Sequence, residues 1–160
     1  MFAEAKKRGF HIVAHAGEVA GPESVWSAIK DLQAERIGHG VRAIEDSQLV
    51  KYLADNKIPL EVCVNSNIKT GVYNGYNDHP IKELFDRGII ITVNSDDPTM
   101  FETTLNEEYF AIKEQIKMPI DKIIRLMNNS IDASFATINE KIKLKKKLNS
   151  YWIQNIDNLN

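Results

Sequence analysis

Four short apolar runs that alternate with helical segments constrain the fold of this chain more than any other feature. The runs lie at residues 11–14, 36–40, 60–64 and 89–94. Each has the length of a buried strand, and successive runs start about 25–30 residues apart, which leaves room for a helix between them. Strands that alternate with helices predict βα units, and therefore an α/β fold with a parallel sheet.

The rest of the chain predicts further helices and no second domain. Helical patterns cover residues 106–116 and about 139–156, and another begins near Pro119, a residue type favoured in the first turn of a helix. No linker or shift in composition interrupts the chain. We therefore expect a single domain over residues 1–160, in which residues 100–160 form the C-terminal helices.

The composition excludes several classes of protein. The 160 residues are 43% hydrophobic and 26% charged, with a formal net charge of -2, which is typical of a globular protein without a basic surface for nucleic acid. No apolar run approaches the ~18 residues of a membrane span, and the N-terminus has no signal-peptide pattern. Cys63 is the single cysteine, so no internal disulfide can form. We expect a cytoplasmic protein that binds neither nucleic acid nor a membrane.

Polar residues that can carry chemistry follow each of the four apolar runs. In chain order they are His15 and Glu18, His39, Asn65 and Asn67, and Asp96 and Asp97. Because the carboxyl ends of parallel strands meet at one edge of a sheet, we expect these side chains to share a site. The adjacent carboxylates repel each other and are costly to bury without a cation or a donor. Neighbours on an extended chain point to opposite sides, so the two acids should have different functions.

Each of these residues also has a structural interpretation. Glu18 can be a helix-start carboxylate that the helix dipole favours, and Asp96–Asp97 can cap the helix that follows. His11 shares a strand face with the site, and His79 precedes a proline at a helix start; we interpret both as structural. Ser66–Asn67 either shapes the floor of a pocket or holds a turn.

Four motifs taken together resemble the adenosine deaminase family. They are His-Ala-Gly-Glu at 15–18, Arg-Ile-Gly-His-Gly at 36–40, Ser-Asn at 66–67 and Ser-Asp-Asp-Pro at 95–98. The resemblance covers about residues 10–105. It implies a (β/α)8 barrel that deaminates 6-aminopurines with zinc, in which these four strands are strands five to eight. The chain would then be the C-terminal half of a metal-dependent-hydrolase barrel.

The resemblance implies a role for five residues. His15 and Asp96 resemble the family's zinc ligands, and imidazole and carboxylate are groups that zinc accepts. Bound zinc lowers the pKa of its water toward neutrality, which supplies a hydroxide nucleophile. His39 resembles the histidine that orients this hydroxide and helps to deprotonate it. Glu18 resembles the acid that protonates the purine nitrogen N1, and Asp97 resembles the acid that binds N7.

A pair of zinc ligands known from the family is missing from this sequence. The family's first strand carries a His-x-His pair, and no such pair occurs in these 160 residues. Residues 1–9 are amphipathic and end in glycine, as at the end of a helix that precedes strand five. A half-barrel leaves two edge strands unpaired, so we expect a homodimer or pairing with a chain that carries the N-terminal half. Alone, the chain is expected to be inactive.

The resemblance leaves the substrate open. The segments Gly21–Trp26 and Asp97–Phe101 resemble the nucleoside and aminodeoxyfutalosine branches of the family more than the free-adenine branch. This resemblance implies a purine nucleoside, which is adenosine or a close analogue such as aminodeoxyfutalosine. The alternatives are an adenine or AMP deaminase relative, and an inactive remnant or accessory half-barrel. Metal content separates these classes, because an enzyme of this type needs about one zinc ion per complete site.

Overall fold

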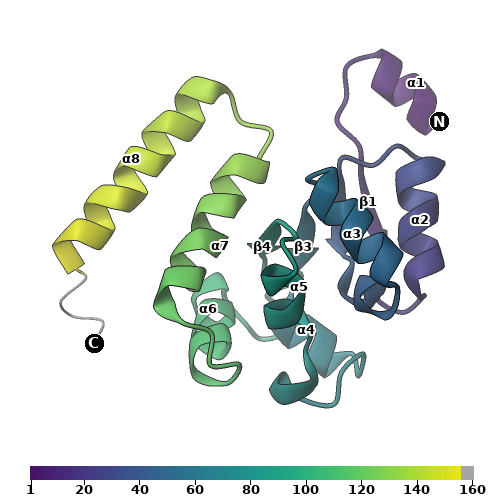
Figure 1. The fold of residues 1–160 in the computed structure, drawn as a ribbon. Coiled ribbons are helices and arrows are strands. Elements are labelled where there is room, and N and C mark those ends of the chain that lie inside the picture. The colour runs from purple at the N-terminus through teal and green to yellow at the C-terminus, as the bar shows by residue number, and fades with distance from the viewer. Residues whose placement is uncertain (156–160) are drawn as a thin grey trace.

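A computed structural model describes residues 1–155 and builds them around one parallel sheet (Figure 1). Its strands are β1 (Val13–Ala16), β2 (Arg36–His39), β3 (Leu60–Val62) and β4 (Ile91–Val93). They lie side by side in chain order, and each pair is parallel. The predicted α/β fold is therefore confirmed for the described residues.

Local sequence explains where several helices begin. Pro22 stands at the first position of its helix, where its fixed φ is favourable, and Asp46 accepts hydrogen bonds from the backbone N–H groups of Gln48 and Leu49. The helices of residues 1–155 are α1 (Phe2–Lys7), α2 (Pro22–Lys30), α3 (Ser47–Asp55), α4 (Val64–Lys69), α5 (Ile81–Asp86), α6 (Leu105–Glu114), α7 (Ile120–Ala133) and α8 (Ile138–Asn155), with 3₁₀ turns at Val41–Glu45 and Tyr76–Asp78.

The predicted strands differ from the observed ones at their ends. The predicted strand 11–14 begins two residues before β1, which continues to Ala16, and the predicted strand 36–40 passes the end of β2 by one residue. The predicted strand 60–64 ends at Val62, and α4 begins two residues later, so the polar residues expected in a turn lie in a helix. The predicted strand 89–94 is longer than β4, which spans only Ile91–Val93. The predicted helix 139–156 corresponds to α8, whose described part ends at Asn155; the single-domain prediction also extends beyond the described residues.

The hydrophobic core lies between the sheet and the helices that cover one of its faces. Helices α2, α3 and α5 lie along this face, α7 packs against β4, and α8 packs on α7 at the far end of the molecule (Figure 1). The largest fully buried side chains include Ile37, Leu49, Leu53, Leu60, Leu84 and Ile91. In residues 1–155 we find no helix of the length and apolar character that a membrane crossing requires.

The other face of the sheet is polar. Strand β1 alternates between exposed and buried residues, so Val13 and His15 lie on the face opposite the core. On the neighbouring strands, Arg36 and Glu61 form an ion pair, with the guanidinium Nε 3.0 Å from the carboxylate. In the described residues, β1 and β4 each pair with one strand only. The sheet therefore presents a polar face between two open edges.

The loop after α7 closes the end of the sheet where the strands begin. The ring of Phe135 stacks on that of His11, with the centroids 3.8 Å apart, and the guanidinium of Arg36 lies 4.0 Å from the centroid of Phe135. Arg36 also donates a hydrogen bond to the backbone oxygen of Ala133 at 2.9 Å. These contacts connect the two C-terminal helices to the first two strands.

A glycine allows the chain to turn directly after β1. Gly17 has a φ of +67°, and a Cβ atom there would meet the side chain of Val25 and lie 3.1 Å from the backbone Cα of Gly40. Only glycine adopts this conformation without a steric penalty. This turn places Glu18 three residues after His15.

We predict that Gly17→Ala destabilises the protein. The left-handed backbone alone should cost about 1–3 kcal/mol, and the contacts with Val25 and Gly40 should add to this cost. Urea denaturation measures the free energy of unfolding. The control is Gly71→Ala, because Gly71 also has a positive φ but has open space around its Cβ position. Equal losses in the two variants would contradict the close packing described here.

Candidate active site

Three of the polar residues predicted at the strand ends line one cavity, whereas Glu18, Asn65, Asn67 and Asp97 lie outside its lining. His15 belongs to β1, His39 is the last residue of β2, Cys63 follows β3 directly, and Asp96 lies three residues beyond β4. The cavity has a volume of about 430 Å³, and its lining consists of His15, Gly38, His39, Glu61, Cys63, Val93, Asn94, Ser95, Asp96 and Leu105. The parallel sheet therefore gathers these side chains at one edge, as the sequence predicts.

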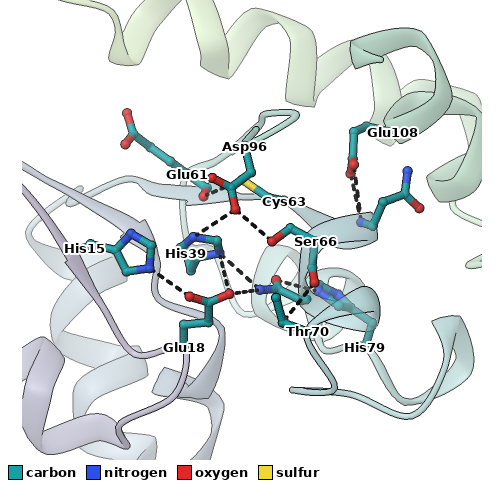
Figure 2. A network of polar contacts seen from close by, with 12 residues as sticks. His15, Glu18, His39, Glu61, Cys63, Ser66, Thr70, His79, Asp96 and Glu108 are labelled. Carbon is teal, nitrogen blue, oxygen red and sulfur yellow. Dashed lines mark hydrogen bonds and ion pairs between the residues drawn. The ribbon is translucent and has the colours of Figure 1, made fainter. Parts of the chain in front are cut away.

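Glu18 lies between the two histidines (Figure 2). One carboxylate oxygen, Oε2, is 2.8 Å from Nε2 of His15, and the other, Oε1, is 3.5 Å from Nδ1 of His39. The two imidazole rings are themselves close, with centroids 4.3 Å apart. The side chain of Glu18 is only 12% exposed, whereas that of His15 is 63% exposed. The carboxylate of Glu18 is thus largely shielded from solvent, whereas the ring of His15 is exposed to it.

Two of the site residues adopt a left-handed backbone. His39 has a φ of +60° and Asp96 a φ of +58°, a region that non-glycine residues visit rarely, although aspartate and histidine are among those that do. Such strain is concentrated at functional sites, because the surrounding structure must hold it in place. The prediction that Asp96 and Asp97 point apart assumed an extended chain, and that assumption does not apply here.

The two neighbouring aspartates make different contacts. Oδ2 of Asp96 accepts a hydrogen bond from the hydroxyl of Ser66 at 2.7 Å and lies 3.7 Å from Nε2 of His39. Oδ1 of Asp97 accepts a hydrogen bond from the backbone N–H of Met100 at 2.8 Å. Asp96 therefore joins the cavity, whereas the hydrogen bond of the Asp97 side chain holds the turn that follows.

Asn67 connects the site to the helix beside it. Its amide nitrogen lies 3.0 Å from Nδ1 of His39 and donates to Oε1 of Glu18 at 3.2 Å. Its amide oxygen lies 3.2 Å from Nε2 of the buried His79. The sequence left the role of Asn67 open and assigned His79 to structure alone, so this connection was missed. The polar Asn-Ser-Asn pattern directly after an apolar strand was its only signal.

Burial holds both interior histidines in the neutral form. Desolvation lowers the pKa of His39, although the carboxylates of Glu18 and Asp96 act in the opposite direction. Desolvation lowers the pKa of His79 to about 3. Burial also raises the pKa of the Cys63 thiol, which makes it a poor nucleophile at neutral pH. The histidines therefore act through neutral nitrogens, each with one donor and one acceptor.

Glu108 is a fully buried carboxylate that supports α4. Its oxygens accept from the backbone N–H of Asn65 at 3.2 and 3.3 Å, and the N–H of Val64 also hydrogen-bonds to it. These N–H groups begin a helix and have no partner within it. Burial raises the pKa of Glu108 to about 7 against the effect of these hydrogen bonds. The acid fixes the helix that carries Ser66 and Asn67.

The side chains at the cavity are suitable for a metal ion. Potential ligand atoms lie within 4.8 Å of one another in two groups, one formed by His15, Glu18 and His39 and the other by His39, Cys63 and Asp96. The predicted ligands His15 and Asp96 fall in different groups, which His39 connects. Imidazole nitrogen and carboxylate oxygen are typical zinc ligands, and the hydrogen bond from Ser66 to Asp96 is of the kind that orients a ligating carboxylate. The ligand atoms at this cavity are therefore of the kinds that zinc binds.

Comparison with known proteins identifies the family. The adenosine deaminase family profile matches residues 1–151, which is nearly the whole chain. The chain belongs to the adenosine deaminase family. It is 42% identical to the aminodeoxyfutalosine deaminase of Streptomyces avermitilis over 94% of its own length, and 44% identical to the adenine deaminase of Crocosphaera subtropica over 90%. It spans 42% and 44% of these two relatives, so it covers less than half of each.

Solved structures of the family confirm the fold class. The adenine deaminase of Arthrobacter aurescens aligns with 96% of this chain at a TM-score of 0.91 and 31% identity, and the chain covers 46% of it. An amidohydrolase from Burkholderia ambifaria, solved with bound zinc, aligns with 99% of the chain at a TM-score of 0.88, and the chain covers 44% of it. Its 22% identity supports the fold alone. The four strands therefore correspond to the C-terminal half of an adenosine deaminase-type barrel.

We predict that Glu108→Gln weakens the dependence of stability on pH. An unfolded chain ionises this group near its ordinary pKa, whereas the folded protein ionises it near 7. The stability that the neutral acid provides is therefore complete below the unfolded pKa, and about 3 kcal/mol of it is lost as the pH rises to 7. Glutamine stays neutral, so the variant should lose less stability between pH 5 and pH 8.

Thermal melts at these two pH values, at one fixed metal concentration, test this expectation. The matched control is Glu107→Gln, because Glu107 is the exposed neighbour on the same helix. The control should keep the pH dependence of the unchanged protein. Identical pH dependence in the Glu108 variant would show that this carboxyl is not the titrating group.

Proposed function

We propose that this chain carries one half of the active site of an enzyme that hydrolytically deaminates a 6-aminopurine. The observation that carries the proposal is the convergence of His15, His39 and Asp96 from three strand ends on one cavity, with Glu18 in contact with both histidines, in a chain of the adenosine deaminase family. These residue types supply metal ligands and acid–base groups, which the replacement of an amino group by water requires.

We propose His15 and Asp96 as ligands of a zinc ion. When bound, zinc lowers the pKa of a water molecule and so supplies a nucleophile at neutral pH. Ser66 keeps the carboxylate of Asp96 in place through its hydroxyl hydrogen bond. A catalytic zinc site needs three protein ligands, so two from this chain call for further ligands from outside these 160 residues. A chain with the N-terminal half would provide them, whereas a homodimer would bring only a second copy of the same groups.

The other residues act on the substrate in this proposal. Glu18, whose side chain is only 12% exposed, protonates the purine nitrogen N1. Because Asn67 donates to Oε1, the proton of the neutral acid belongs on Oε2. His39 faces the side of the cavity where Asp96 lies and would orient the attacking water. Asp97 is proposed to bind N7 of the purine.

Two observations favour different purine substrates. The segments Gly21–Trp26 and Asp97–Phe101 and the similarity to an aminodeoxyfutalosine deaminase favour a nucleoside or its analogue. The similarity to adenine deaminases, at almost the same identity, favours the free base. We propose a purine nucleoside as the substrate, with free adenine as the alternative that rate measurements can select.

Ammonia release from adenosine, aminodeoxyfutalosine and adenine tests this function. The assembled protein with zinc should deaminate at least one of them, and the ratio of kcat/KM values identifies the substrate. Faster turnover of adenine would replace the nucleoside proposal while keeping the reaction. A protein that binds about one zinc per site but releases no ammonia from any of them would contradict the proposed reaction, and little bound zinc would favour an accessory half-barrel.

Glu18→Gln should abolish most of the activity but retain the metal. The variant keeps the shape and the acceptor oxygen of the side chain but cannot donate the proton, so kcat should fall by about 10²–10⁴-fold. Elemental analysis checks that the zinc content is unchanged. Glu23→Gln is the control, since Glu23 lies five residues away and bonds to the backbone of Gly21. Near-normal turnover by Glu18→Gln would contradict the assigned acid role.

A further inference from the structure

A chain of hydrogen bonds leads from a backbone N–H group into the active site, and Figure 2 shows two of its members, His79 and His39. The N–H of Ile81 donates to Nδ1 of His79 at 3.3 Å, and Nε2 of His79 lies 3.2 Å from the amide oxygen of Asn67. The amide nitrogen of Asn67 lies 3.0 Å from Nδ1 of His39. His39, Asn67 and His79 are all buried, so each polar group needs a partner within the protein.

The direction of this chain is fixed at both ends. A backbone N–H can only donate, so Nδ1 of His79 accepts and the ring's proton belongs on Nε2. That N–H then donates to the amide oxygen of Asn67. At the other side, Oε1 of Glu18 accepts from the amide nitrogen of Asn67 at 3.2 Å, both in the ionised acid and in the neutral acid that carries its proton on Oε2. The amide therefore has one orientation.

The orientation of the amide determines the proton on His39. The NH₂ group of Asn67 faces Nδ1 of His39, so this nitrogen accepts a hydrogen bond. A neutral imidazole carries one proton, which must then lie on Nε2, the nitrogen 3.7 Å from Oδ2 of Asp96. In the other tautomer, two N–H donors would face each other across 3.0 Å, and the acceptor Glu18 is more distant, at 3.5 Å.

We propose that His79 is a positioning residue that, through Asn67, holds His39 as the Nε2–H tautomer. His39 then offers the cavity an N–H donor and not a lone pair. It can orient a water molecule or stabilise developing negative charge, but it cannot accept a proton at this nitrogen in the resting state. Among the groups around His39, the carboxylate of Asp96 keeps acceptor capacity toward the cavity. The catalytic meaning of the tautomer rests on the proposed deaminase function, whereas the tautomer itself does not.

Nuclear magnetic resonance of the protein labelled with ¹⁵N-histidine tests the tautomer directly. The chain has four histidines, and the signals that disappear in a His39→Gln variant assign His39. Couplings between the ring nitrogens and the carbon-bound ring protons should show a protonated Nε2 and a bare Nδ1. A protonated Nδ1 in the unchanged protein would overturn the proposal, whatever the enzyme activity proves to be.

Variants of His79 test the relay. His79→Leu removes the donor to Asn67 and should shift His39 toward the other tautomer, while kcat on the purine that is turned over falls about 10- to 100-fold at nearly constant KM. His79→Gln keeps an N–H donor and should restore both the tautomer and most of the activity. His11→Gln, at the opposite end of the strands, is the matched control and should change neither.

The outcomes separate the two proposals. An unchanged His39 tautomer in folded His79→Leu would overturn the relay. Equal losses of kcat in His79→Leu and His79→Gln would also overturn it. Should His79→Leu fail to fold, the spectra of the unchanged protein and of His79→Gln still decide the proposal, because both should show His39 protonated at Nε2. Loss of deaminase activity toward every purine tested, together with the expected His39 spectrum, would contradict the proposed function and leave the relay supported.

Discussion

The hydrogen bonds of Asn67 are the interaction on which the site depends. Strand order brings Glu18 and His39 to the same edge of the sheet, but it does not fix which way their polar atoms face. The amide of Asn67 does so, because its two ends cannot exchange roles between the carboxylate of Glu18 and the ring of His79. Asn67 is in turn held by α4, whose first N–H groups bond to the buried Glu108. A fully satisfied buried network of this kind favours one arrangement of its members.

The sequence predicts the fold and the position of the site well, because both follow from a simple pattern. Apolar runs separated by helices lead to a parallel sheet, and residues directly after the strands lie at its carboxyl edge. This argument placed His15, His39 and Asp96 together, and the structure places them in one cavity. The four motifs also indicated the family, which the profile match over residues 1–151 confirms.

The same pattern could not predict what depends on distant contacts. Helix α4 contains two asparagines and a serine, which are poor helix formers, and its supporting acid Glu108 lies 43 residues beyond Asn65. The left-handed backbone of His39 and Asp96 is likewise imposed by the surrounding structure, so an argument from extended strands misses it. A histidine before a proline gives no sign that its ring will orient an amide twelve positions earlier. The assigned roles of the five site residues remain predictions.

The contact of Phe135 with His11 and Arg36 has a consequence for the order of folding. Residue 135 is synthesised 124 residues after residue 11, and at about 5–20 residues per second this delay is roughly 6–25 s. Until then the first two strands lack the ring that covers their starting end. During synthesis the nascent chain must therefore keep β1 and β2 from wrong partners for longer than the helices α2 and α3 need to form. The closure comes from a segment that is made after all four strands.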